Sequence, residues 1–600
     1  MVSGRVLVTT ALEETWPQDG QPVVFLGEWC RLHGRRRRWE PMDAEVARYH
    51  WDDRARLEQD FRYLQEVHAR LLPMLAAQLN ALHGVDHGER YWRILVGPWL
   101  GQFLQILFDR WTMLKVAVRD HAVAQVRLVQ RGAGPAAPRD MQEFNQAVCS
   151  DDWNERLYGQ ILQACALVPE ILPVTSAAAV QQAAATARTQ AGGRLLVRAV
   201  LRLEGWLGRH DRYFFLSTGL GIRQSLQLQL RLGQLPKLWR SPALVLPQAR
   251  SRDREWCLAA DTLDPFVALA ARLVPGHIPV AYLEGYSALC AQVQRLPWPR
   301  RPEVIFTSSA YNSDEAFKAW AGEKVSGGSR LVVGQHGGNY GTARWSFFEQ
   351  HEQAIADRYL TWGWDAGPRG RAVGNFKQFS SPFPPARSGS ALMVQMALPR
   401  YSYHMYSVPV AAGQWAGYFQ DQCRFIAALP ERIRRETVVR LFPTDWEYRQ
   451  RERWTERFPG LTLDTGSMPL ARQMAGARVY ISTYNATTFL ESMGINFPTI
   501  IFWNPLHWEL RDAAKPHFHL LEEVGIFHQT PEGAARYLAE IWEDVNAWWN
   551  GERVQSARAR FCALYSDTRA ETFGRLAAAL EEARRLPGSS TDDEGGMTCE

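Results

Sequence analysis

Short apolar runs alternate with amphipathic stretches along most of the chain. In the first half, apolar runs predict strands at 5–10, 22–26, 212–217, 303–307 and 331–333. In the second half, they predict strands at 358–362, 391–396, 437–441, 461–463, 477–482 and 499–502. Helical spacing of apolar residues predicts helices between them, at 222–232, 314–324, 413–429, 469–475 and 487–494. Strands that alternate with helices are typical of α/β proteins with parallel sheets, so this is the predicted fold class.

The segment from about 43 to 205 interrupts this alternation, and we predict it to be a helical insertion. Apolar residues at helical spacing predict a helix over 53–82, with Pro73 as a kink or a division. The most apolar stretch, 94–118, contains charged and amide residues, which predicts a buried helix and no membrane span. The alanine- and glutamine-rich residues 177–191 predict an exposed helix or a loose connection.

Prolines and serines at 379–390 indicate a linker between two α/β halves. We therefore predict a Rossmann-like N-terminal domain over 1–380, a linker over 381–390 and a Rossmann-like C-terminal domain over 391–586. Long helices close the second domain, and the composition of 587–600 predicts a disordered tail. Both sheets would present the carboxyl ends of their strands to one cleft.

Composition narrows the class of protein only slightly. A content of 46% hydrophobic and 22% charged residues indicates folded domains, and a net charge of +5 on 600 residues gives no reason to expect a nucleic-acid partner. The basic cluster at 35–38 predicts a solvated loop, with contact to phosphate or anionic lipid as the alternative. Eight scattered cysteines without a Cys-x-x-Cys pair favour reduced thiols in a cytosol, and the N-terminus reads as a strand rather than a signal peptide.

The first candidate site is the glycine-rich turn at 335–341, which follows the predicted strand at 331–333. Glycines allow the backbone to approach a bound group closely, and a histidine can change charge near neutral pH. His336 is therefore a general base on an acceptor hydroxyl, a donor to phosphate, or a histidine packed in the turn.

The second candidate site is the polar loop at 482–487, which joins a predicted strand to a predicted helix. Backbone N–H groups and hydroxyls at a helix N-terminus form an anion site that suits phosphate. Glu491, one turn into the helix, would reach ribose or sugar hydroxyls. The alternative is an ordinary helix that is capped by Asn485 or Thr487.

A third candidate is the loop after the predicted strand at 437–441. Arg440 would pair with phosphate, with Asp445 and Trp446 beside it, and an ordinary surface turn is the alternative. No Asp-x-Asp motif stands out between the sheets, so the sequence requires no divalent metal and no cofactor.

With these motifs in view, the chain resembles the transferases of O-antigen and other surface-carbohydrate gene clusters. The resemblance rests on residues 91–100, 317–324, 334–341, 361–364 and 483–491, which are spread over most of the chain. The last stretch is also distantly similar to the donor-binding segment of GT-B glycosyltransferases. This similarity implies a GT-B-like arrangement in which the first domain takes the acceptor and the second holds a nucleotide sugar. The helical insertion departs from the GT-B pattern.

The sequence and the resemblance together predict a metal-independent transferase in the cytoplasm, either free or peripheral at the inner membrane face. It would move sugar from a nucleotide-sugar donor to a glycan or lipid-linked glycan acceptor. A nucleotide-sugar epimerase or phosphotransferase on the same frame, or a non-catalytic scaffold, are the alternatives. His336 is the predicted catalytic residue, and the predicted donor- or substrate-binding residues are Gln335, Gly337, Gly338, Asn339, Arg440, Asp445, Ser482, Thr483, Asn485, Thr487, Thr488 and Glu491.

Overall fold

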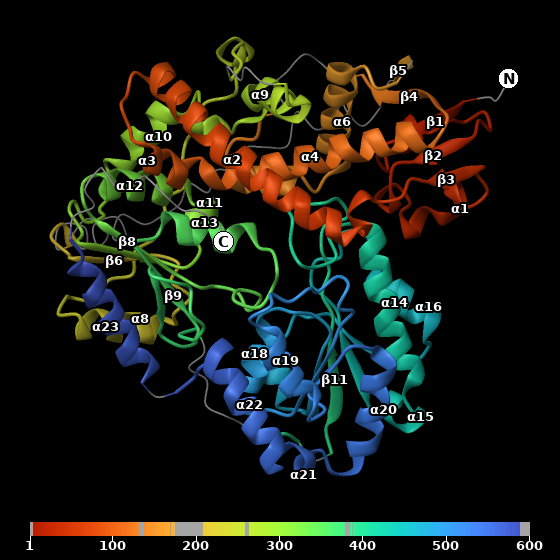
Figure 1. Ribbon diagram of the computed structural model, residues 1–600, viewed down its shortest axis with the longest axis vertical. Helices are drawn as coiled ribbons and strands as arrows, with labels where there is room; N and C mark the ends of the chain where they lie inside the picture. Colours follow the sequence, from red (N-terminus) through yellow and green to blue (C-terminus); the bar gives the residue numbers. More distant parts are fainter. Residues whose placement is uncertain are drawn as a thin grey trace, which may run out of the picture.

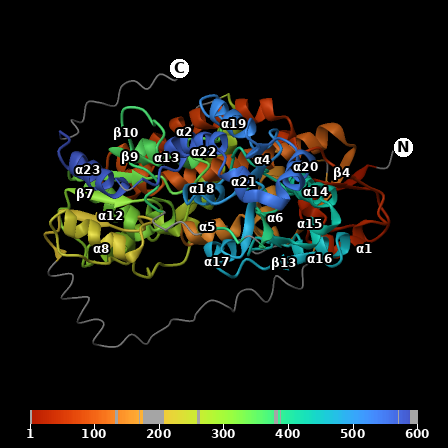
Figure 2. The same cartoon turned by 90° about the horizontal axis from the view of Figure 1, so that it is seen from below.

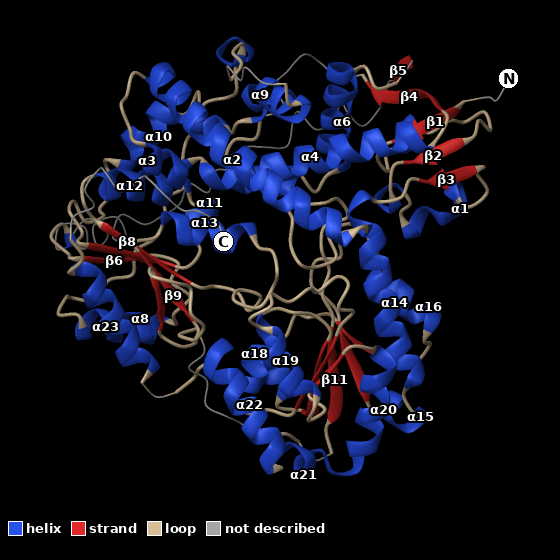
Figure 3. Cartoon of the chain, viewed as in Figure 1, coloured by secondary structure: helices blue, strands red, loops and turns tan. Residues whose placement is uncertain are grey.

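Three parallel β-sheets with surrounding helices make up the protein (Figures 1 and 3). The structure is a computed structural model that describes residues 4–130, 137–168, 170–174, 208–258, 263–377, 384–386, 388–569 and 571–587. The predicted α/β fold with parallel sheets is confirmed. The predicted helix at 177–191, most of the predicted linker and the predicted tail after residue 587 lie outside the described residues.

The first sheet has the strand order β3-β2-β1-β4-β5, and all its neighbouring strands are parallel. Its strands are β1 (Arg5–Val8), β2 (Val23–Phe25), β3 (Ala44–Val46), β4 (Val123–Val129) and β5 (Glu170–Val174). Its helices are α1 (Arg36–Trp39), α2 (Arg54–His83), α3 (Glu89–Leu95), α4 (Gly97–Asp120), α5 (Met141–Ala147) and α6 (Asp151–Cys165). The insertion predicted at about 43–205 is rich in helices, but it also supplies three strands of this sheet.

The long helix α2 shows how the local sequence determines where a helix begins and ends. The side chain of Asp53 accepts a hydrogen bond from the backbone N–H of Arg56, which caps the start of the helix. Gly84 ends it in the left-handed conformation, with φ of 63°. Pro73 lies inside the helix without dividing it. Helix α4 is buried along nearly its whole length, and none of the helices described here has both the length and the apolarity to cross a membrane.

The second sheet has the order β10-β9-β8-β7-β6. Its strands are β6 (Tyr213–Phe215), β7 (Val304–Thr307), β8 (Arg330–Gly334), β9 (Arg358–Thr361) and β10 (Gly370–Ala372). The helices of this part are α8 (Ile222–Arg231), α9 (Pro265–His277), α10 (Tyr286–Val293), α11 (Ala310–Ser313), α12 (Glu315–Ser326) and α13 (Phe347–Ile355). The last helix, α23 (Thr572–Arg584), returns from the end of the chain to pack beside β7 and β8 (Figure 2).

The third sheet has the order β13-β12-β11-β14-β15-β16, so the strand order reverses between β11 and β14. Its strands are β11 (Ser390–Val394), β12 (Thr437–Arg440), β13 (Thr462–Asp464), β14 (Ala477–Ser482), β15 (Thr499–Phe502) and β16 (Phe527–His528). Its helices are α14 (Ala412–Ala428), α15 (Glu431–Arg435), α16 (Gln450–Arg457), α17 (Leu470–Met474), α18 (Thr487–Gly494), α19 (Lys515–Glu522), α20 (Pro531–Ile541), α21 (Val545–Trp549) and α22 (Glu552–Tyr565). The crevice beside such a reversal is where open parallel sheets bind ligands.

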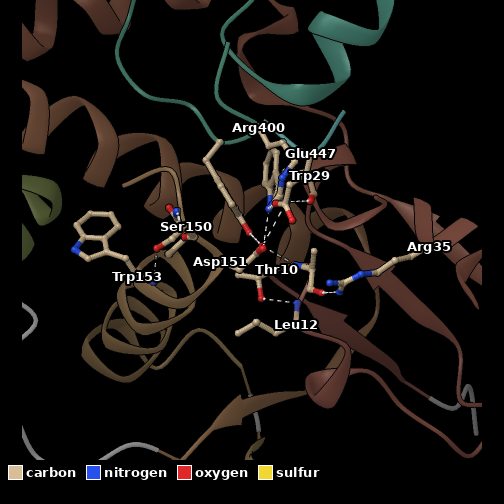
Figure 4. Close-up of polar contacts among 12 residues, drawn as sticks. Thr10, Leu12, Trp29, Arg35, Ser150, Asp151, Trp153, Arg400 and Glu447 are labelled. Carbon is tan, nitrogen blue, oxygen red and sulfur yellow. Dashed lines mark hydrogen bonds and ion pairs between the residues drawn. The ribbon is translucent and has the colours of Figure 1, made fainter. Parts of the chain in front are cut away.

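A buried polar network joins the third sheet to the first (Figure 4). Arg400, which follows β11, donates to Asp151 Oδ2 at 2.7 Å and to the backbone oxygen of Trp29 at 2.6 Å. It also pairs with Glu447, and Asp151 accepts hydrogen bonds from the hydroxyl of Tyr401 and, at 3.0 Å, from the backbone N–H of Ala11. The side chain of Arg400 is only 4% exposed, so this contact excludes water.

The basic cluster at 35–38 also contributes to this junction; its side chains are largely exposed, as predicted, but they lie on a short helix and not on a loop. Its residues form most of α1, and Arg36 donates to Glu456 Oε1 of α16 at 2.9 Å. Arg35 and Arg38 form ion pairs with Glu13. Three of the four arginines are therefore neutralised by carboxylates that are distant in sequence.

Candidate functional site

The glycine-rich turn at 335–341 leaves the carboxyl end of β8, the central strand of the second sheet. Gln335 is fully buried and fixes the turn to the next strand. Its Oε1 accepts hydrogen bonds from the backbone N–H of Trp362 at 3.0 Å and from Nε1 of Trp364 at 2.9 Å, while its Nε2 donates to Gly337 O at 2.8 Å. The side chain of Gln335 therefore shapes the turn, and its predicted contact with a ligand stays a prediction.

His336 stands at the open side of the turn, with 37% of its side chain exposed. Its Nδ1 is buried and lies 3.1 Å from Oε1 of Glu352, a close approach without the alignment of a hydrogen bond. The ring packs edge-on against Tyr340, with ring centroids 5.1 Å apart. Because Nδ1 faces a carboxylate, the exposed part of the ring is the part available to a ligand.

Glu352 is the centre of a buried cluster of hydroxyl groups. It accepts hydrogen bonds from the hydroxyls of Tyr340 at 2.9 Å, Tyr359 at 3.1 Å and Tyr311. Burial, reinforced by the charge of Glu352, raises the pKa of all three tyrosines well above the usual value, so they stay protonated as donors. A carboxylate held in this way can stabilise a protonated imidazole, the arrangement that a histidine needs to act as a general base.

The polar loop at 482–487 lies at the carboxyl end of β14, beside the reversal of strand order. The hydroxyl of Thr483 donates to Val394 O at 2.8 Å, which ties the end of β14 to the end of β11, and it lies 2.6 Å from the hydroxyl of Tyr418. The hydroxyl of Ser482 donates to Tyr484 O at 3.2 Å. Ser482 and Thr483 are both buried, so they hold the shape of the loop.

Helix α18 begins without a side-chain cap. Its N-cap residue is Ala486, so neither Asn485 nor Thr487 takes the capping role that was the alternative to a functional site. Thr488 donates to the hydroxyl of Tyr484 at 3.0 Å and accepts from that of Tyr480 at 2.6 Å. With no cap side chain, the first-turn N–H groups of α18 remain available to an anion.

The structure brings the turn at 335–341 and the start of α18 into direct contact. The backbone N–H of Gly338 donates to Thr487 Oγ1 at 3.2 Å, and Thr342 donates to Asn485 Oδ1 at 3.2 Å. A Cβ atom at Gly338 would lie 2.5 Å from the carbonyl oxygen of Ala486, so this approach requires glycine. Asn339 closes the turn, because its carbonyl accepts from the N–H groups of Thr342 and Ala343.

Lys377 and Glu491 add opposite charges next to the contact between the turn at 335–341 and α18. Lys377 Nζ donates to the carbonyl oxygen of His336 at 2.9 Å. Burial raises the pKa of Glu491, and the charge of Lys377 partly opposes this shift. Burial likewise lowers the pKa of Lys377, with Glu491 opposing. Each charge therefore favours the ionised form of the other, which suits a site that binds polar groups.

Arg440 and Asp445 are engaged in other contacts. Arg440 donates to Gln473 Oε1 at 2.6 Å, to Asp464 Oδ1 at 3.3 Å and to the carbonyl oxygens of Gly466 and Met468. Asp445 accepts from the backbone N–H groups of Arg449 and Gln450, at the start of α16. Among the residues that the structure describes, neither hydrogen-bonds to the turn at 335–341 or to the loop at 482–491. Contact of either with a donor would require an exchange of partners and stays a prediction.

Comparison with known proteins places the chain in a family. A family model described as LIC12162 family transferase matches residues 5–579. The chain belongs to this family. The protein is therefore a transferase, as predicted. No curated protein matches it.

Solved glycosyltransferase structures show a distant similarity to this LIC12162 family transferase. MurG of Acinetobacter baumannii is 12% identical with a TM-score of 0.32, and the match covers 62% of this chain and 99% of MurG. WaaG, a glycosyltransferase of lipopolysaccharide biosynthesis, is 11% identical with a TM-score of 0.26 over 61% of this chain and 99% of WaaG.

Two contributors to the site of this transferase, Glu352 and Lys377, were not predicted from the sequence. Glu352 carried a usable signal: it lies four residues after Phe348 and three before Ile355, so a carboxylate occupies the apolar stripe of α13. A charge on such a stripe indicates either a buried partner or a functional role. Lys377 carried no comparable signal, because it stands alone after Phe376 and reaches the site only through the tertiary fold.

Proposed function

We propose that this transferase moves a glycosyl group from a nucleotide-sugar donor to a hydroxyl of a surface-polysaccharide precursor, an O-antigen-type acceptor. The observation that carries the proposal is the contact between the uncapped start of α18 and the turn that holds His336. The first would bind the donor diphosphate, and the second supplies a histidine backed by a buried carboxylate.

In the proposed reaction, the acceptor oxygen forms a bond to the anomeric carbon of the donor sugar. The acceptor proton moves to Nε2 of His336, while Glu352, which faces Nδ1, stabilises the imidazolium. The bond between the anomeric carbon and the donor phosphate oxygen breaks, and the nucleoside diphosphate leaves with its new charge near the N-terminus of α18. The hydroxyl of Thr487 would contact phosphate, and that of Thr488 would do so by exchanging its hydrogen bond to Tyr484. Glu491 would bind ribose or sugar hydroxyls. The scheme uses no metal ion.

The reaction would take place in the cytoplasm, where nucleotide sugars are made, with the acceptor either free or carried at the inner membrane face. An epimerase or a phosphotransferase would use the same phosphate site without a glycan acceptor. A scaffold would need neither a donor nor a base, so the paired His336 and Glu352 favour an enzyme.

Thermal-shift and calorimetric titrations with UDP, GDP, CDP, ADP and dTDP test the donor site. We expect one of these nucleotides to stabilise the wild-type protein. Thr488→Val should weaken its binding, because it replaces the hydroxyl near the start of α18 with a methyl group of similar size. Thr455→Val, at an exposed threonine of α16, is the matched control. If no nucleotide binds, the donor assignment fails and the scaffold is favoured.

A further inference from the structure

A cavity lies away from the His336 turn, between the first and third sheets. It has a volume of about 630 Å³. One wall is formed by residues that follow the carboxyl ends of β2 and β3, and the opposite wall is the first half of α14. None of its lining residues belongs to the turn at 335–341 or to the loop at 482–491. The carboxyl edge of a parallel sheet is the usual place for a ligand in this fold class.

Positive charge exceeds negative charge around this cavity. Three arginines line it, against two carboxylates, Glu28 and Asp52. Arg31 is paired with Glu28 at 2.5 Å and lies over the ring of Trp39 at 4.7 Å. The other two, Arg48 and Arg453, form no ion pair with any residue that the structure describes. Nε of Arg453 donates to Tyr448 O at 2.8 Å, which leaves its two Nη groups for another acceptor.

The two histidines of the cavity do not add to this charge at neutral pH. Burial lowers the pKa of His507 to about 4, with the charge of Arg54 acting in the same direction. Burial also lowers the pKa of His33, and the charge of Arg453 adds to that shift. The excess of positive charge therefore comes from the arginines, whose planar groups suit the oxygens of phosphate.

The helix wall leaves space for a ligand. Ala416 and Gly417 are exposed residues of α14 that line the cavity, and a Cβ atom at Gly417 would meet nothing within 4 Å. On the opposite side, Trp39 is partly exposed and offers an aromatic face beside Arg31. A group with phosphate oxygens could thus reach the arginines without moving the backbone.

We propose that this cavity binds a phosphate-bearing ligand, with Arg48 and Arg453 as its ligands for the phosphate oxygens. The site is separate from the donor site at α18, and the inference does not depend on the proposed glycosyl transfer. If the cavity binds a phosphate of the acceptor, that role rests on the proposed glycosyl transfer, because only a transferase needs a second substrate in this cavity.

Calorimetric titration of the full chain with inorganic pyrophosphate tests the site. The donor site is first saturated with the nucleotide that binds best, or left empty if none binds. We expect Arg48→Gln to weaken pyrophosphate binding about tenfold, as loss of one charge-assisted contact requires. Arg37→Gln removes an exposed arginine outside the cavity and should leave the dissociation constant within about twofold of the wild type.

A blocking variant makes the test independent of charge. Ala416→Trp should fill the cavity and abolish binding, whereas Ala427→Trp, at an exposed alanine eleven positions along the same helix, should not. Farnesyl diphosphate, titrated in parallel, shows the source of the phosphate. If farnesyl diphosphate binds and Ala416→Trp removes this binding, the ligand is lipid-borne. If only pyrophosphate binds, the ligand is soluble. The proposal is overturned if pyrophosphate does not bind, or if each variant behaves like its control.

Discussion

Among the contacts that join the third sheet to the other two sheets, two have opposite character. Toward the first sheet, Arg400 and Asp151 form a buried ion pair with hydrogen bonds on every side (Figure 4). Toward the second, the contact at Gly338 and Thr487 is made by backbone and hydroxyl groups, beside a histidine that is 37% exposed. The first contact satisfies its polar groups internally, while the second leaves polar groups for something outside the protein.

This difference separates structural from functional polar residues. A buried ion pair with complete hydrogen bonding fixes one arrangement of two units, because loss of either partner leaves a charge without water or a counterion. A half-exposed site with an uncapped helix start has backbone N–H groups without acceptors, and a ligand can accept hydrogen bonds from them.

Arg400→Met should cost about 3–5 kcal/mol of unfolding free energy, because it leaves the carboxylate of Asp151 buried without its partner. Urea unfolding at neutral pH measures the loss. Arg424→Met is the control, since the side chain of Arg424 is 48% exposed and its pairs with Asp421 and Glu532 should contribute no more than about 1 kcal/mol. Equal effects of the two substitutions would mean that the network with Asp151 does not fix the junction.

His336→Gln should leave stability nearly unchanged and reduce transfer about 10²–10⁴-fold, the usual contribution of a general base. Nucleotide binding should be retained, because the side chain does not belong to α18. His210→Gln, at an exposed histidine away from the site, should keep full activity. Full transfer by the His336 variant would leave the histidine as a packing residue of the turn.

The sequence predicted the central strands well because parallel strands that are buried on both faces are continuous apolar runs, as in β8 and β14. It missed β3, β10 and β16, which are two or three residues long at sheet edges, and the edge strand β5. It also missed β4, whose apolar residues alternate with Gln125 and Arg127 after a long helical segment. The number of sheets was therefore underestimated, although the fold class was right.

For the site, the sequence indicated which loops follow strands, and the structure joins two of them at Gly338 and Thr487. It could not indicate where the partners of Arg440 come from. Asp464 and Met468 lie more than twenty positions away and reach it only because β12 and β13 are neighbours in the third sheet. A charged residue after a strand looks the same in sequence whether its partner is a ligand or another loop.

Gly338→Ala should separate the turn from α18, because the new Cβ would stand 2.5 Å from the carbonyl oxygen of Ala486, a backbone atom. We expect a loss of about 1–3 kcal/mol of unfolding free energy, typical of overpacking, together with weaker nucleotide binding. Gly276→Ala is the control, since a Cβ there meets nothing within 4 Å. Unchanged nucleotide affinity would show that the site does not need the contact between the two loops.

The smallest expected effects are on how stability depends on pH. Asp151, at the contact with the first sheet, and Glu491, near the contact with the second sheet, should make stability depend on pH in opposite directions. Burial acts to raise the pKa of Asp151, but the charge of Arg400 and hydrogen bonds outweigh it and hold that pKa below its usual value. Asp151 therefore stabilises the fold above the unfolded pKa of about 4, and this stabilisation is lost as pH falls through the folded pKa. Burial raises the pKa of Glu491 despite Lys377, so its ionised form destabilises the fold as pH rises.

Urea unfolding of Asp151→Asn and Glu491→Gln at several pH values between 3 and 7 measures how each carboxylate changes the unfolding free energy with pH. Relative to the wild type, Asp151→Asn should lose more stability at pH 7 than at pH 3. Glu491→Gln should instead gain stability as pH rises through the folded pKa of Glu491, because the variant no longer has to bury a charge. A nucleotide that binds next to Glu491 would change its environment and alter the second dependence while leaving the first alone. If both variants showed the same slope, the two contacts would not differ in the way that their geometry indicates.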